Sequence, residues 1–127
     1  MFQIALIGIG GFVGSVLRYL ASGWVQQALN SSDFPFGTLF VNLAGCLTIG
    51  VLSQLAESRG LFTPESRALV FIGFLGGFTT FSTFGNETFN LLRDGETLRS
   101  FANISATLLL CLGAVWIGRA AAQLIWR

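Results

Sequence analysis

The residues best suited to chemistry in this chain form one short run, residues 76–87, with the sequence GGFTTFSTFGNE in apolar surroundings. Glycine and threonine are weaker helix formers than leucine or alanine, so their concentration here predicts a break in a helix. A break releases backbone carbonyl groups, which are hard oxygen ligands of the kind that an alkali cation needs. The alternative is a glycine-rich packing seam in which the hydroxyl groups bond back to the helix.

Aromatic rings and hydroxyl groups alternate in the same run. Phe81 and Phe84 are three residues apart and share a helical face. The positive edge of an aromatic ring can approach an anion. Ser82 and Thr83, on the flank of that face, supply hydroxyl donors that can replace water around a small anion. Simple packing of the two rings is the alternative interpretation.

Two polar residues interrupt other apolar segments. Asn42 has an amide with two N–H donors, and a lone asparagine in a membrane helix either joins helices together or lines a cavity. Arg18 keeps its charge and either extends to the membrane interface or lines a wet vestibule that attracts anions. We favour the vestibule for Arg18 and leave both roles of Asn42 open.

Membrane helices must hold these groups, because the chain is too apolar for a soluble protein. Of its 127 residues, 53% are hydrophobic and 10% are charged, whereas soluble proteins contain about 25% charged residues. Thr63 followed by Pro64 predicts the start of the third helix. We expect an all-α membrane protein with one domain, residues 1–127, and a third helix broken at mid-membrane. The predicted spans are residues 3–28, 36–56, 66–91 and 98–125.

Composition also excludes several classes of protein. The net charge of +1 gives no basic patch for nucleic acid. Cys46 and Cys111 lie in apolar stretches, where we expect buried thiols rather than a disulfide. No carboxylate–histidine pair or cofactor loop is present in the sequence, so we predict no enzyme. The N-terminus lacks the features of a cleaved signal peptide, and we expect the first segment to stay in the membrane.

The arginines leave the orientation of the chain almost undecided. The face shared by the termini and the second loop is predicted to hold Arg59, Arg67 and Arg127, and Arg119 is a further candidate. The opposite face is predicted to hold Arg93 and Arg99, and Arg18 is a further candidate. Orientation follows the arginine and lysine excess of cytoplasmic loops. So small a bias predicts that the chain inserts both ways and forms an antiparallel pair.

Four motifs together resemble the Fluc (CrcB-like) family of fluoride channels. The most specific is residues 76–84, GGFTTFSTF, and the similarity covers essentially the whole chain. The other three are Gly37-Thr38-Leu39 followed by Asn42, Gly10-Gly11 with Gly14, and Leu17-Arg18-Tyr19.

The resemblance implies an antiparallel, dual-topology homodimer with two anion pores, each built from both subunits. It implies a structural sodium ion at the dimer centre, held by backbone carbonyls at Gly76 and Thr79. The pore phenylalanines of the family correspond to Phe81 and Phe84 and its pore asparagine to Asn42. The hydroxyl track corresponds to Ser82 and Thr83, and an acidic position beyond it to Glu87.

This chain departs from the family pattern at three positions. Gly85 replaces a common serine, and Thr107 and Cys111 stand where the fourth helix of the family often has pore serines. Thr107 retains a hydroxyl donor, whereas the thiol of Cys111 is a weaker one.

The resemblance implies passive fluoride efflux across the bacterial inner membrane. A small dual-topology multidrug transporter is the main alternative, and it would need a membrane-centred carboxylate, for which Glu87 is the only candidate. A structural membrane subunit without transport is a further alternative.

Overall fold

The computed structural model describes residues 1–126, and its secondary structure is entirely helical. The chain forms three long helices, α1 (Phe2–Ala28), α2 (Phe36–Arg59) and α6 (Thr97–Ile125), and a composite third segment between α2 and α6 in sequence. Arg127, one of the arginines used to predict the orientation of the chain, lies outside the described residues. The composite segment consists of α3 (Pro64–Arg67), the π-helix η1 (Ala68–Leu75), α4 (Gly76–Phe78) and α5 (Phe81–Arg93).

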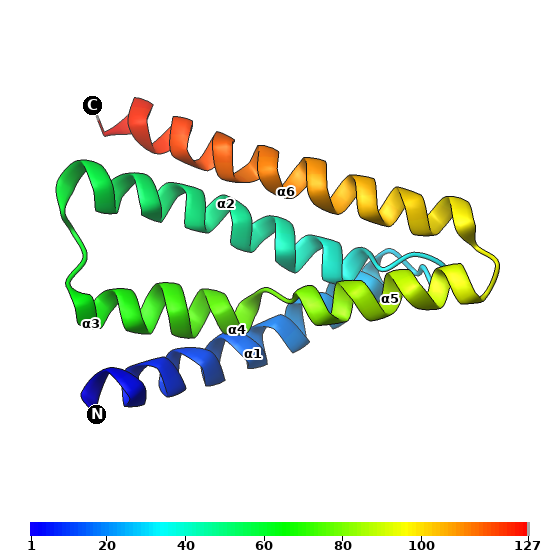
Figure 1. Ribbon diagram of the computed structural model, residues 1–127, viewed down its shortest axis with the longest axis horizontal. Helices are drawn as coiled ribbons and strands as arrows, with labels where there is room; N and C mark the ends of the chain where they lie inside the picture. Colours follow the sequence, from blue (N-terminus) through cyan, green and yellow to red (C-terminus); the bar gives the residue numbers. More distant parts are fainter. Residues whose placement is uncertain (127) are drawn as a thin grey trace.

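The four segments run alternately up and down, so both ends of the described chain lie at the same end of the molecule (Figure 1). Helix α2 packs along α6, and the two run in the same direction. Helix α1 packs against η1 and α4. The third segment thus contacts α1 through η1 and α4, and α6 through α5.

The four predicted spans are confirmed as helical segments long and apolar enough to cross a membrane. Thr63 caps the third segment as predicted, since its hydroxyl accepts from the backbone N–H of Ser66 at 3.3 Å and Pro64 follows. Helix α2 continues through residues 57–59, which were expected to form a loop. It ends where Gly60 adopts a left-handed conformation, φ 59°, and donates to the carbonyl of Ala56.

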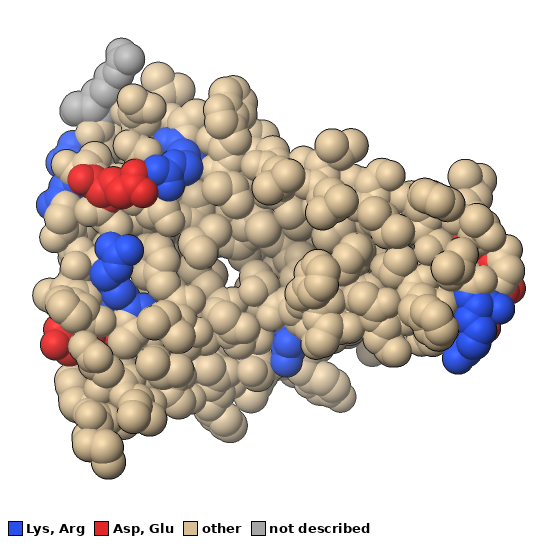
Figure 2. All heavy atoms as spheres, in the orientation of Figure 1, with Lys and Arg blue, Asp and Glu red and all other residues tan. Residues whose placement is uncertain are grey.

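The outer surface of the molecule suits lipid rather than water. Large apolar side chains stand exposed along its length; Phe12, Leu109 and Trp116 are each more than 70% exposed. Figure 2 shows charged side chains gathered mainly at the two ends, with a largely uncharged surface between them. A monomeric soluble protein rarely exposes apolar area on this scale.

Glycines allow the paired helices to approach closely. A Cβ atom at Gly14 of α1 would lie 2.9 Å from the backbone nitrogen of Phe78 and would overlap the carbonyl of Phe74. Gly50 of α2 meets the backbone of Val115 on α6 in the same way. Small residues are the usual means of packing membrane helices, and these glycines allow that packing here.

The π-helix η1 was not predicted. Its residues 68–75 are uniformly apolar, and no periodicity in them distinguishes a π-helix from an α-helix. It lies directly against Gly10 of α1, where a Cβ would come within 2.8 Å of the backbone nitrogen of Phe74.

Candidate functional site

The third segment is interrupted at two extended residues. Thr79 (φ −88°, ψ 157°) and Thr80 (φ −151°, ψ 118°) separate α4 from α5. A break at the GGFTT run was predicted, and its depth in a bilayer stays a prediction. The Thr80 hydroxyl caps the new helix by accepting from the backbone N–H of Thr83 at 3.3 Å. The Thr79 hydroxyl donates back to the carbonyl of Leu75 at 2.9 Å.

Asn42 of α2 holds the extended backbone in place. Its Oδ1 accepts from the backbone N–H of Thr80 at 2.7 Å, and its Nδ2 donates to the carbonyl of the same residue at 3.0 Å. Both residues are buried. The Asn42 side chain therefore satisfies a donor and an acceptor that the interrupted helix leaves without regular partners. Of its two amide hydrogens, this arrangement uses one.

The backbone carbonyls of residues 76–79 lose their regular helical donors at the interruption, because no backbone N–H of residues 80–83 donates to them. In an α-helix the carbonyl of Gly76 would accept from the N–H of Thr80, but that N–H donates to Asn42. The carbonyl of Thr79 would accept from the N–H of Thr83, which donates to the hydroxyl of Thr80. Gly76 and Thr79, which the resemblance assigns to a sodium site, are two of these four residues, and their role as ligands stays a prediction. Gly76 lies at the exposed surface of the chain.

A cavity of about 250 Å³ opens beside Asn42. It is almost entirely apolar, and residues of α2, of the interruption, of α5 and of α6 form its wall. The lining residues predicted as site residues are Asn42, Thr79, Phe81, Phe84 and Thr107. Cys111 of the fourth helix also lines it, together with Cys46, Thr80, Leu108 and Leu112.

The two predicted phenylalanines are adjacent at this cavity. Their ring centroids are 5.5 Å apart with an interplanar angle of 50°. Phe84 is buried at 8% exposure, whereas Phe81 is 78% exposed. One ring therefore belongs to the core of the chain, and the other extends from its surface.

The remaining predicted site residues lie outside this cavity. Ser82 and Thr83 are exposed on the first turn of α5, where their hydroxyls lie 3.4 and 3.0 Å from that of Thr80. Arg18 is half-buried on α1 and lines neither this cavity nor the larger one described next. Gly76 is likewise absent from both walls.

A larger cavity, of about 460 Å³, lies towards the end of α5. Glu87 lines it and accepts a hydrogen bond of 2.8 Å from the hydroxyl of Thr38. The other oxygen of Glu87, Oε2, is buried and has no hydrogen-bond partner within residues 1–126. The pairing links α5 to α2 at a distance of 49 residues in sequence, so the sequence indicated Glu87 and Thr38 separately but not together.

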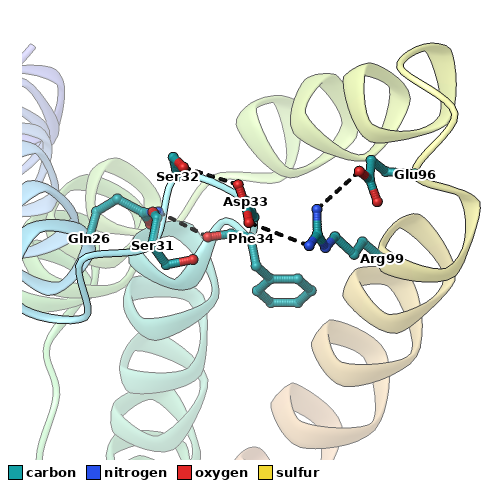
Figure 3. A network of polar contacts seen from close by, with 7 residues as sticks. All are labelled: Gln26, Ser31, Ser32, Asp33, Phe34, Glu96 and Arg99. Atoms are coloured by element: carbon teal, nitrogen blue, oxygen red, sulfur yellow. Dashed lines mark hydrogen bonds and ion pairs between the residues drawn. The ribbon is translucent and has the colours of Figure 1, made fainter.

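Residues of the loop between α1 and α2 line the larger cavity, and polar contacts hold this loop (Figure 3). The Gln26 amide donates to the carbonyls of Phe34, at 2.9 Å, and Ser31, and accepts from the backbone N–H of Gly37 at 3.0 Å. Arg99 of α6 pairs with Asp33 of the loop at 3.4 Å and with Glu96 at 3.1 Å (Figure 3). Helices on both sides thus fix the loop.

Sequence reasoning missed three polar residues that the structure makes important. Thr80 joins the Asn42 contact to the cap of α5. Asn103 of α6 is 1% exposed and donates to the hydroxyl of Thr88 at 2.9 Å. Ser100, also buried, donates to the carbonyl of Thr88 at 3.1 Å. Asparagine and serine in a charge-free apolar run were the available signal for the last two.

Comparisons with known proteins place the chain in a family. The model of the family described as CrcB-like protein, Camphor Resistance (CrcB), matches residues 5–119. Fluoride-specific ion channel FluC 1 of Methanosarcina acetivorans is 48% identical over 96% of this chain and 92% of its own length. Fluoride-specific ion channel FluC of Geotalea daltonii is 44% identical over 98% of this chain and 100% of its own length. The FluC protein of Shewanella loihica is 45% identical over 94% of each chain. With a match over nearly its whole length, this chain belongs to the CrcB-like family.

Proposed function

We propose that the chain forms a fluoride-selective channel for passive efflux of the ion across the bacterial inner membrane. Relatives at about 45% identity over nearly the whole chain are named fluoride-specific ion channels. The family is one of channels and not of enzymes, as the sequence predicted. The four apolar segments of this chain make it a multi-pass membrane protein, which agrees with the predicted location in a bacterial membrane.

The observation that supports this function best is the amide N–H donor of Asn42 that the contact with Thr80 leaves unused. One amide hydrogen holds the carbonyl of Thr80, and the other is free to donate at the cavity wall. A pore for fluoride must return much of the hydration that the ion loses, and fixed donors in an apolar cavity do so. Thr107, on the α6 side of the same cavity, adds a hydroxyl donor.

Aromatic edges and hydroxyl groups extend this donor set. Phe81 and Phe84 line the cavity together and offer positive ring edges without a competing charge. Thr83 accepts a hydrogen bond from the hydroxyl of Thr80, so its own hydroxyl hydrogen is free to donate to an anion. Ser82, exposed beside it, is the next donor along α5. In this proposal Arg18 contributes positive charge at a vestibule rather than at the cavity itself.

The functional unit in this proposal is an antiparallel, dual-topology homodimer. The near-even division of arginines between the two ends supports insertion in both orientations. An exposed Phe81 and an exposed apolar surface support a second copy as the partner that completes each pore. A cysteine tag at one terminus, labelled from each side of intact vesicles, should react in about half of the molecules from either face if the two orientations are equally populated. Labelling from one side alone would contradict dual insertion.

The sodium ion is the second part of this proposal. Its ligands would be backbone oxygens, because residues 1–126 contain no cluster of three or more His, Cys, Asp or Glu side chains. The carbonyls of Gly76 and Thr79 fit this role, since both lack their helical donors. When bound, the ion would hold together the interrupted segments of two subunits at mid-membrane. If exchange of sodium for a large organic cation changed neither dimer content nor fluoride flux, the assignment would be wrong.

Fluoride efflux from liposomes tests the main proposal. Purified protein is reconstituted into potassium fluoride-loaded liposomes, and external fluoride is followed with an electrode after valinomycin is added. We expect rapid efflux of fluoride and none of chloride in a parallel preparation. Efflux no faster than from protein-free liposomes would overturn the channel function and leave the multidrug transporter and the structural subunit as the remaining interpretations.

Liposomes with the same protein also test the alternative function, that of a multidrug transporter. That alternative needs a membrane carboxylate, and Glu87 is half-buried with one oxygen bonded to Thr38. A proton-driven transporter should move an organic cation in response to a pH gradient, whereas the proposed channel should move fluoride without one. The names of the relatives favour the channel.

A further inference from the structure

Two cysteines from different helices share the wall of the smaller cavity. Cys46 of α2 and Cys111 of α6 are both free thiols, and both line the cavity of about 250 Å³ beside Asn42. Cys46 is half-buried and Cys111 is 9% exposed.

The register of α2 against α6 places Cys46 and Cys111 on facing turns of the two helices. The two helices run in the same direction, and the Cα position of Gly50 packs on the backbone of Val115. One helical turn earlier on each helix brings Cys46 opposite Cys111. One further turn brings Asn42 opposite Thr107, and all four residues line the one cavity. The close approach at Gly50 keeps the backbones near enough for short side chains to face one another.

We propose that Cys46 and Cys111 form a two-thiol binding site for a soft metal ion such as Hg²⁺, next to the Asn42 donor. Thiolate sulfur is the protein ligand that soft metals prefer. A tetrahedral zinc site would need three or four protein ligands, and no third His, Cys, Asp or Glu joins the pair within residues 1–126. An ion that accepts two sulfur ligands in a line fits this pair instead.

The binding step conserves charge and involves no oxidation. Each thiol gives up its proton to solvent, two S–Hg bonds form, and two chloride ions leave when mercuric chloride is the source. The product is one S–Hg–S bridge between α2 and α6. It lies one turn from Asn42 and Thr107, so it would block the anion path. This last consequence rests on the proposed channel function.

Thiol stoichiometry tests the site without any transport measurement. The purified protein receives one equivalent of mercuric chloride per chain, and the remaining thiols are counted with a maleimide after denaturation. We expect both thiols to disappear and the intact chain to gain the mass of one mercury less two hydrogens. The matched variants Cys46→Ser and Cys111→Ser should hold mercury through one sulfur and one remaining chloride, and so gain the mass of HgCl less one hydrogen, whereas the wild-type chain releases both chlorides.

Three results would overturn the bridge: one thiol remaining per chain at one equivalent, no uptake of mercury, or chains joined to each other through mercury. If either serine variant fails to fold, the mass and the thiol count of the wild-type chain still decide whether the bridge forms.

Fluoride efflux is a separate readout on the same preparation. We expect one equivalent of mercuric chloride to reduce wild-type efflux to the leak of empty liposomes, and excess dithiothreitol to restore it. Unchanged efflux in a chain that has bound mercury between its thiols would refute the block. Absence of efflux before treatment would count against the channel function alone, because the thiol count does not depend on it.

Discussion

Replacement of Asn42 by leucine tests how the interrupted third segment is held. Leucine is close to asparagine in size, so the packing of α2 is largely kept. The change removes both hydrogen bonds to Thr80, those of 2.7 and 3.0 Å. The N–H and carbonyl of Thr80 are then left in a buried place that leucine cannot satisfy.

The expected cost follows from these two groups. A buried donor or acceptor left without its partner costs about 1–3 kcal/mol, so two of them cost about 2–6 kcal/mol in free energy of unfolding. The apolar cavity beside Asn42 offers few alternative partners, which favours the upper part of this range. A loss of this size would lower the yield of assembled protein as well as its resistance to denaturation.

Denaturant titration of purified protein in detergent, followed by size-exclusion chromatography, measures this cost. Asn86→Leu is the matched control, because Asn86 lies exposed on α5 and makes no side-chain hydrogen bond within the described chain. We expect that variant to stay within about 0.5 kcal/mol of wild type. If Asn42→Leu and Asn86→Leu unfolded at the same denaturant concentration, the hydrogen bonds to Thr80 would not be what holds the interrupted segment in place.

Asn42→Asp separates the structural role of Asn42 from the proposed binding role. A carboxylate oxygen still accepts from the N–H of Thr80, but both amide donors are lost and a negative charge faces the cavity. We expect fluoride efflux per assembled dimer to fall more steeply than the assembled fraction, because like charges repel strongly in an apolar cavity. Efflux that tracks dimer content in this variant would refute a direct role of Asn42 in binding the anion.

Two further substitutions test packing and the rings. Gly14→Ala should destabilise the chain by about 1–3 kcal/mol, as overpacking does, because its Cβ would overlap the backbone of Phe74. The control Gly113→Ala has nothing within 4 Å of its Cβ and should be neutral or stabilising. Equal denaturation midpoints for the two variants would contradict the close approach at Gly14. Phe81→Ile should reduce fluoride efflux per assembled dimer by about tenfold, equivalent to about 1.4 kcal/mol, since the positive ring edge is lost. The control Phe101→Ile, another exposed phenylalanine, should conduct as wild type does, and normal efflux from the Phe81 variant would make that ring a packing residue only.

Local sequence determined the elements of this fold. Long charge-free runs separated by polar loops specify four helical segments, because an apolar helix in lipid satisfies its own backbone. Thr63 and Pro64 mark the start of the third segment through capping chemistry that involves only neighbouring residues. The GGFTT run predicts an interruption because low helix propensity is a property of those residues alone.

Tertiary structure alone decided which polar groups meet. The pairing of Asn42 with Thr80 depends on the rotation of α2 against the third segment, which hydrophobic runs without amphipathic periodicity do not specify. The place of Thr107 and Cys111 at the cavity depends on the register of α6 along α2, set by glycine contacts in both helices. In a helix whose faces are all apolar, the sequence shows which residues can bond, but only the packing of its neighbours determines which of them do.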